Sequence, residues 1–229
     1  KKSPQSPSAN DLKEQAAEVL TPRLMVEIPF AYPAREVDLK VKYRNLTGLT
    51  VELYRMNLPV TSNILEREIT ASTVSQYGKL VGTRHYQLAA TPDYMETDTL
   101  LRYKFPTEGI YILKSIPDGH RKYTAYGKAY VSSLQAISLG LPGGKQEINI
   151  IARLTGHPVA GTEVAYYRVL QGEGYRLVKA YPADSKGTVT LTPPDERNWL
   201  GINVRKPGAD YMEISYAGFS GAGYNVPAS

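Results

Sequence analysis

Alternating apolar and polar positions dominate residues 36–44, where Val37, Leu39, Val41 and Tyr43 alternate with charged or polar neighbours. A period of two is typical of a β-strand with one buried and one wet face. Six further apolar runs precede residue 132, at 24–28, 49–53, 83–89, 97–105, 109–116 and 123–131. Seven short runs separated by turn residues predict an antiparallel β-sandwich of immunoglobulin-like size.

A second set of seven apolar runs follows in the remaining residues. These runs lie at 134–139, 147–154, 162–169, 175–181, 188–192, 199–204 and 211–216. The chain is therefore predicted to be all-β, with two tandem seven-stranded sandwiches of the immunoglobulin or fibronectin-III type at 23–132 and 133–229. Between Tyr130 and Leu139 there is no Pro, Gly or charge, so we expect no flexible linker and a junction packed by Leu134 and Ile137.

Two segments depart from the strand pattern. Residues 1–22 are expected to form an arm at 1–9 and a short helix capped by Asn10 or Asp11 and ended by Thr21-Pro22. Residues 57–82 are expected to be a helical or irregular insertion. A helix in this segment would be capped by Ser62 or Asn63 and would carry its apolar residues on one side. The β-branched residues of the segment weaken the helical pattern. The side consists of Ile64, Leu65, Ile69 and Val74.

The clearest turn signals lie in the second half of the chain. The run ending at Leu154 meets Gly156 and Pro158, which disfavour continued regular structure, and a β-rich run resumes at Thr162. A second turn, 184–187, precedes another strand run. The residues expected to carry this structural turn motif are Gly156, Pro158, Val159, Gly161, Asp184 and Gly187.

These turns resemble those of the bacterial α2-macroglobulin-like proteins. Macroglobulin-like domains carry a turn of the form TGKPVAGA followed by a hydrophobic strand, and later a D-x-x-G turn. Residues 155–161 and Val164 match this pattern, while His157 replaces the usual Lys and Thr162 the usual Ala. Strand segments around Tyr43, Tyr54 and residues 109–145 also resemble the family, so the resemblance covers roughly residues 23–217.

The resemblance implies a non-catalytic structural segment of a protease-trapping protein. Proteins of this family act as endopeptidase inhibitors: a bait segment is cut, the molecule rearranges, and the protease is caged. The implied partners are proteases and the other domains of a longer chain, and the implied location is the cell envelope, periplasmic or outer-surface. The bait region and thioester would lie outside this segment, which contains no cysteine.

The residues argue against an enzyme. The absence of Cys excludes cysteine nucleophiles, disulfides and zinc–thiolate sites within the chain. The three histidines, His85, His120 and His157, lack metal-ligand spacing. The segment 218–221 lacks the spacing of a serine nucleophile elbow, and 140–145 lacks that of a phosphate loop and is read as a hairpin. We therefore expect no catalytic residues, cofactor or metal, and assign the carboxylate pairs Glu66/Glu68 and Asp195/Glu196 to the solvated surface.

Charge and aromatic content bear on the partners of the chain and leave two rival hypotheses. The net charge of +5 is spread without a basic run, so we expect no nucleic-acid partner, and no run reaches the roughly 18 apolar residues of a membrane helix. The 18 tyrosines suit half-buried strands, as at Tyr43, Tyr111, Tyr130 and Tyr166. Alternatively, a tyrosine-bearing face or the loop 195–199 would serve a carbohydrate-binding or adhesin-type module of a cell-envelope protein. A third reading is an enzyme's accessory domain without a ligand of its own.

Overall fold

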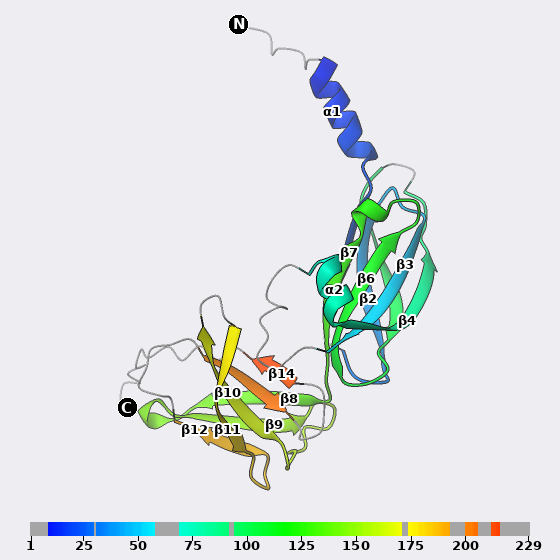
Figure 1. Ribbon diagram of the computed structural model, residues 1–229. Helices are drawn as coiled ribbons and strands as arrows, with labels where there is room; N and C mark the ends of the chain where they lie inside the picture. The colour runs from blue at the N-terminus through cyan, green and yellow to red at the C-terminus, as the bar shows by residue number, and fades with distance from the viewer. Residues whose placement is uncertain are drawn as a thin grey trace, which may run out of the picture.

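The computed structural model describes residues 9–29, 31–57, 69–91, 94–170, 174–192, 200–205 and 212–215. Its architecture is two β-sandwiches in tandem, with a helix projecting from the first (Figure 1). Within the described residues neither helix has the length and apolar character that crossing a bilayer demands. The expected all-β class with tandem seven-stranded sandwiches is confirmed for this part of the chain.

The first sandwich contains the first seven strands, divided into two antiparallel sheets. The three-stranded sheet has the order β1-β2-β5 and the four-stranded sheet the order β4-β3-β6-β7. The strands are β1 (Arg23–Glu27), β2 (Glu36–Arg44), β3 (Gly48–Met56), β4 (Gly78–Gln87), β5 (Thr97–Lys104), β6 (Gly109–Pro117) and β7 (Ala125–Val131).

The predicted alternation of β2 builds one wall of the first core. Leu39, Val41 and Tyr43 are at most 1% exposed, whereas the lysines between them face water. Leu39 lies opposite Leu101 in the β2–β5 register, so both strands turn their apolar residues inward. The opposite wall is supplied chiefly by β3 and β6, so the two sheets turn their apolar faces toward each other.

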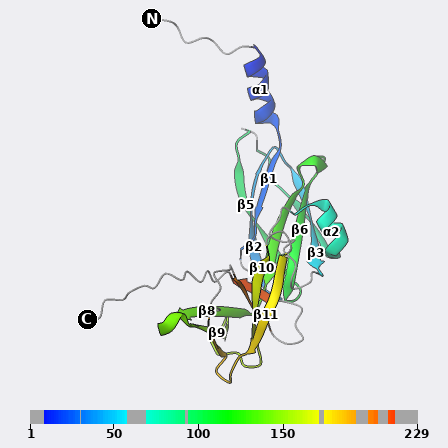
Figure 2. The same cartoon turned by 60° about the vertical axis from the view of Figure 1, so that its left-hand side comes forward.

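The second sandwich contains the remaining seven strands, again in two antiparallel sheets. Their orders are β12-β9-β8 and β11-β10-β13-β14. Strands of the two sheets cross at a large angle in both Figure 1 and Figure 2, as in orthogonal sheet packing. The strands are β8 (Leu134–Gly140), β9 (Gln146–Ala152), β10 (Glu163–Leu170), β11 (Gly174–Pro182), β12 (Thr188–Leu191), β13 (Leu200–Arg205) and β14 (Met212–Ser215).

The described part of the second core lies mainly on β9 and β12. Ile148 and Ile150 are buried together with Val189 and Leu191, and Leu134 joins them from the start of β8. The hairpin expected at 140–145 is present: Gly140 pairs with Gln146 across a short 3₁₀ turn, η3 (Pro142–Gly144). Residues 140–145 therefore form a hairpin turn, as predicted, and not a phosphate-binding loop.

The helices depart in part from expectation. Helix α1 (Ala9–Leu20) begins before both predicted caps and ends at the expected Thr21-Pro22. Helix α2 (Ala71–Tyr77) is capped by Thr70, whose hydroxyl accepts from the Thr73 amide. Of the expected insertion 57–82, residues 78–82 already belong to β4, because their pairing with β3 outweighs local helix propensity. The expected caps Ser62 and Asn63, with Ile64 and Leu65, lie outside the described residues.

A third apolar cluster places α2 on the outer face of the four-stranded sheet. Ile69 and Val74 are buried there against Met56 and Ile112. Figure 1 shows α2 lying against this sheet. Two members of the predicted apolar side, Ile69 and Val74, are therefore buried on one face of the sheet.

Candidate functional site

The first motif turn follows the end of β9 and brings the chain back beside the last residues of that strand. The amides of Thr155 and Gly156 both donate to the Ala152 carbonyl, at 3.1 and 2.8 Å, and the Ala152 amide donates to the His157 carbonyl at 2.8 Å. Gly156 has φ +70°, a left-handed conformation that glycine adopts without strain. Pro158 then forms an antiparallel bridge with Ile151, so the turn runs back beside β9 before the chain crosses to the other sheet.

The second motif turn is held by the Asp184 side chain. Its Oδ1 accepts from the amides of Lys186 and Thr188, at 2.9 and 2.8 Å. The Gly187 amide donates to the Asp184 carbonyl at 3.0 Å. An Asp that accepts from backbone amides two and four residues later fixes a tight turn in this way. The turn thus delivers the chain into β12 with Gly187 at φ +69°.

Strand β9 brings the two turns together. The Ile150 amide donates to the Gly187 carbonyl at 2.8 Å, and the Ile150 carbonyl accepts from the Val159 amide at 2.9 Å. A Cβ added at Gly187 would lie 2.6 Å from the Ile150 oxygen and 2.9 Å from the Val159 nitrogen. Three backbones therefore meet at Gly187 with no room for a side chain.

The remaining motif residues lie at the edge of this contact. Val159 is half-buried and packs against the second core, and its carbonyl accepts from the Thr162 hydroxyl at 3.0 Å. Gly161 has φ +71°, and a Cβ at Gly161 or Gly156 would have no neighbour within 4 Å. At Gly156 and Gly161 the glycine is needed only for the left-handed backbone conformation. At Gly187 it is needed also because backbone atoms of Ile150 and Val159 approach too closely for a Cβ.

The junction between the sandwiches is polar, contrary to the expected apolar packing. Ile137 is 42% exposed and does not pack there, and Leu134 is buried in the second core. Instead, Glu108 Oε1 accepts from the Ser133 amide at 3.0 Å and also contacts the Ser133 hydroxyl. The Arg153 amide donates to the Ser133 carbonyl at 2.8 Å. Glu108 and Arg153 carried no local pattern that marked them, because their roles depend on partners far away in sequence.

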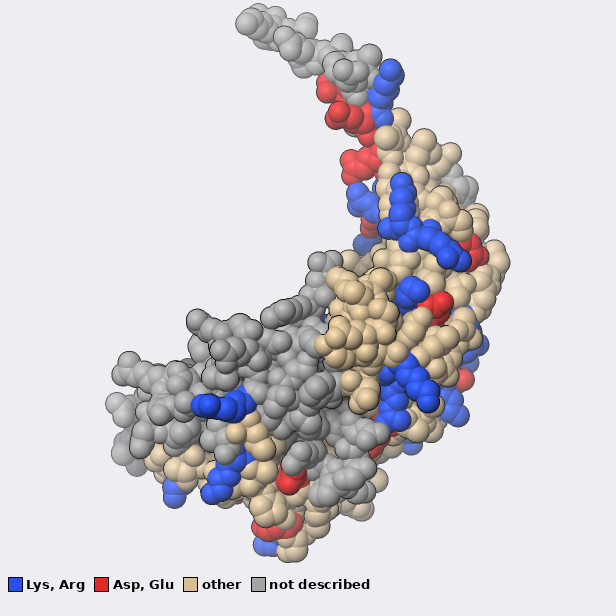
Figure 3. Space-filling view, viewed as in Figure 1, with Lys and Arg blue, Asp and Glu red and all other residues tan. Residues whose placement is uncertain are grey.

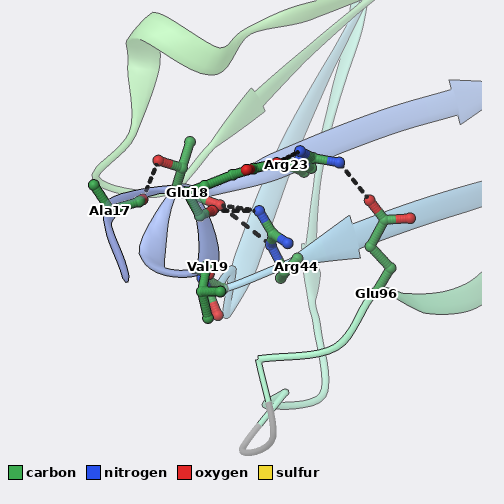
Figure 4. A network of polar contacts seen from close by, with 8 residues as sticks. Ala17, Glu18, Val19, Arg23, Arg44 and Glu96 are labelled. Atoms are coloured by element: carbon green, nitrogen blue, oxygen red, sulfur yellow. Dashed lines mark hydrogen bonds and ion pairs between the residues drawn. The ribbon is translucent and has the colours of Figure 1, made fainter. Parts of the chain in front are cut away.

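Helix α1 is attached to the first sandwich through its C-terminal carbonyls (Figure 4). Arg44 Nη2 donates to the Glu18 carbonyl at 2.6 Å, and Asn45 Nδ2 donates to the Val19 carbonyl at 2.8 Å. Arg23 pairs with the Glu18 carboxylate at 2.8 Å and with Glu96 at 3.3 Å. Cationic and amide donors suit the carbonyl end of a helix.

The tyrosines whose side chains the structure describes are mostly packing residues. Tyr43 and Tyr111 are fully buried, and Tyr130 is half-buried against the third apolar cluster. Of the tyrosines whose side chains the structure describes, Tyr94 alone is exposed, at 48%. Tyr166 lies in β10, where side chains are not described. The described tyrosines therefore match the packing interpretation better than a flat, exposed platform for sugars.

One ion pair lies on the outer face of the four-stranded sheet. Lys114 Nζ and the Tyr54 hydroxyl each donate to Glu52 Oε2 at 2.8 Å. The hydrogen bond from Lys114 lowers the pKa of Glu52, and the same bond raises the pKa of Lys114. Burial, with the hydrogen bond to Glu52, raises the pKa of Tyr54. The pair is charged at neutral pH and rests between half-buried tyrosines, an arrangement that holds the sheet face together.

This ion pair predicts a pH-dependent stability. Because the folded pKa of Glu52 is lowered, its contribution is present above its unfolded pKa of about 4.3 and is lost as the pH falls through the folded value. With both side chains about a quarter exposed, we expect Glu52→Gln to cost no more than about 1 kcal/mol at pH 7. Urea unfolding at pH 7 and pH 3 should show that cost shrinking toward zero at pH 3; an equal cost at both would contradict this role.

The histidines do not form a site. His85 Nε2 lies 2.8 Å from Asp118 Oδ2, with both side chains about half exposed, and His157 is exposed on its turn. His120 lies beside the Tyr123 ring. In the part of the chain that the structure describes, no three His, Cys, Asp or Glu side chains converge as metal ligands. Glu66/Glu68, the loop 195–199 and the segment 218–221 lie outside that part.

Charge is dispersed over the face of the first sandwich that Figure 3 shows. On the face shown in Figure 3, Lys and Arg form several separate groups on the first sandwich, with Asp and Glu between them. Lys42 and Arg23, for example, share the carboxylate of Glu96. A nucleic-acid site would need a continuous basic patch, and this face does not present one.

Comparison with solved structures shows which known fold this chain has. No protein-family model and no curated protein matches the sequence. Solved structures do: native alpha-2-macroglobulin from Escherichia coli spanning domains MG0-NIE-MG1 has a TM-score of 0.65 at 17% identity, over 85% of this chain and 64% of that one. The chain has the fold of this part of bacterial alpha-2-macroglobulin.

Two further structures of alpha-2-macroglobulin agree. The Escherichia coli structure spanning domains NIE-MG1 has a TM-score of 0.59 at 15% identity and is covered over 97% of its length, with 85% of this chain. A mutant of Salmonella alpha-2-macroglobulin gives the same TM-score and identity over 85% of this chain, but only 12% of that protein is covered. The likeness therefore extends through both sandwiches, and the chain spans less than two thirds of the first structure and about an eighth of the Salmonella one.

Proposed function

We propose that this chain is a non-catalytic structural segment of an alpha-2-macroglobulin-like protein. The observation that carries the proposal is the match of both sandwiches together, over 85% of the chain, to consecutive alpha-2-macroglobulin domains. Isolated immunoglobulin-like sandwiches occur in proteins of many functions. Agreement of two consecutive sandwiches in one structural match is a more specific likeness than agreement of one.

The proposed organisation follows the strands. Residues 1–22 form the arm and helix, 23–132 the first macroglobulin-like sandwich and 133–229 the second. The motif turns at Gly156–Gly161 and Asp184–Gly187 serve to hold the C-terminal end of β9 in the second sandwich. In the complete protein the segment contributes to the wall of a protease trap, its partners are proteases and other domains of the same chain, and its location is the cell envelope or periplasm.

A sugar-binding module is less well supported. Such a module presents exposed aromatic rings, and the described tyrosines other than Tyr94 are buried or half-buried. The loop 195–199, the other candidate for sugar contact, lies outside the described residues. The structural role therefore remains the proposal that the described surface supports best.

We expect the purified chain to lack protease, esterase and glycosidase turnover and to bind no glycan on an array. The physical reason is that the sequence contains no Cys and no Gly-x-Ser-x-Gly elbow, and that no three His, Cys, Asp or Glu side chains of the described residues converge as metal ligands. Chromogenic substrates and a glycan array measure both properties directly. Turnover abolished by one substitution within the chain, or saturable glycan binding lost on Tyr94→Ala, would refute the proposal.

A further inference from the structure

We propose that Glu108, Ser133 and Arg153 form a polar lock that fixes the angle between the two sandwiches. Strand β7 ends at Val131 and β8 begins at Leu134, so two residues join the sandwiches. A short link alone does not fix an angle, because two residues still offer four rotatable backbone torsions. The lock arises from the partners of the groups in that link, and it is independent of the proposed function.

The first sandwich holds the start of the link. The Ser132 amide donates to the Ala31 carbonyl at 3.2 Å, and Ser132 is fully buried. The Ser132 hydroxyl in turn accepts from the Leu134 amide at 3.0 Å. A buried hydroxyl used in this way replaces a backbone partner that the interrupted strand no longer supplies. The link therefore leaves the first sandwich in one defined direction.

Glu108 holds the middle of the link from the first sandwich. This half-buried residue immediately precedes β6, and its Oε1 receives both the amide (3.0 Å) and the hydroxyl of Ser133. Its own carbonyl accepts from Arg55 Nη2 at 3.4 Å, which ties the residue to β3. Hydrogen bonds to an ionised carboxylate are roughly twice as strong as neutral ones. Rotation about the Ser133 torsions would break two of them at once.

Arg153 holds the same link from the second sandwich. Its amide donates to the Ser133 carbonyl at 2.8 Å, and its Nη2 and Nε donate to the Leu134 carbonyl at 3.0 and 3.2 Å. The guanidinium carbon also lies 5.9 Å from the centre of the Tyr32 ring, which belongs to the first sandwich. Arg153 thus contacts the link and the opposite sandwich together, with cation–π attraction across the junction.

Both backbone groups of Ser133 have partners that a hinge at this residue would have to release. The Ser133 amide is bonded to the first sandwich and the Ser133 carbonyl to the second. A bending motion at this residue would therefore separate charged or backbone partners on both sides. Interfaces between domains commonly permit motion when they are small, and this set of contacts opposes it.

The angle can be measured by double electron–electron resonance between two spin labels. The chain has no cysteine, so Thr83→Cys on β4 and Ser185→Cys on the second motif turn provide the only two labelling sites, and both positions are exposed. With the lock intact we expect one narrow distance distribution. Glu108→Ala removes the carboxylate and should widen the distribution at least twofold.

Three further variants in the same labelled background make the result decisive. Glu108→Gln keeps a side-chain oxygen acceptor and should stay narrow, as should Glu36→Ala, an exposed control on β2. Arg153→Met keeps the aliphatic stem and the backbone bond to Ser133 but loses the guanidinium that lies over the Tyr32 ring of the first sandwich, so it should widen the distribution. It decides the question alone if Glu108→Ala fails to fold by circular dichroism. If Glu108→Ala and Arg153→Met fold but give distributions as narrow as that of Glu36→Ala, the proposal is overturned.

Discussion

Gly187→Ala is expected to destabilise the second sandwich by about 3–5 kcal/mol. The substitution places a Cβ 2.6 Å from the Ile150 oxygen and 2.9 Å from the Val159 nitrogen, and backbone atoms of a paired strand cannot step aside as a flexible side chain would. It also imposes a left-handed conformation on a residue with a Cβ, which costs about 1–2 kcal/mol. The strain would act on the hydrogen bonds through which β9 joins the two motif turns.

Gly156→Ala is the matched control for this prediction. Its φ of +70° is almost identical to the +69° of Gly187, but a Cβ there meets nothing within 4 Å. We expect a cost of only about 1–2 kcal/mol, from backbone conformation alone. Thermal unfolding followed by circular dichroism separates the two variants, since 1 kcal/mol corresponds to about 4–8 °C in a sandwich of this size. Equal melting temperatures would show that the two turns do not meet as described.

Val159→Asp is expected to cost roughly 2–4 kcal/mol, the second-largest effect. Val159 packs against the second core while its backbone is bonded to Ile150 and Thr162, so the side chain cannot swing into water without breaking those bonds. An unpaired carboxylate at that position would lose hydration without gaining a partner.

His157→Lys provides the comparison for Val159→Asp. His157 is exposed on the same turn, and the hydrogen bond it accepts from Ala152 uses the backbone carbonyl, which the substitution leaves in place. The effect should stay within about 0.5 kcal/mol. Urea denaturation gives both values on one scale. If both variants unfold at the same urea concentration, Val159 is not packed against the core as the structure has it.

Local patterning predicted most strands because each sheet buries one face. The alternation around Leu39, Val41 and Tyr43 is visible in the sequence, and all three are buried. Left-handed turns were equally visible, since Gly156 and Gly187 occupy positions where other residues would be strained. The period-two signal reports which side of a strand is covered, and this is set mainly by neighbours in the same sheet.

Contacts between distant residues were not predictable in the same way. Residues 78–82 resembled an insertion locally but pair with β3, and Ile137 was expected at the junction but is exposed. Glu108 bonds to Ser133 across 25 positions, so no window of sequence contains both partners of the lock. For the same reason, only one of the two roles of Gly187 could be predicted from the sequence. Its turn could be recognised, but its approach to Val159 could not.

The proposal that this chain forms part of the wall of a protease trap is tested most directly by caging, in the longer alpha-2-macroglobulin-like protein that the proposal implies. The intact longer protein is incubated with a protease, and hydrolysis of a small chromogenic peptide is compared with hydrolysis of a large protein substrate. A cage admits the peptide and excludes the protein, so we predict retained peptide cleavage with strongly reduced protein cleavage. Undiminished hydrolysis of both substrates, at saturating amounts of the longer protein, would contradict the account.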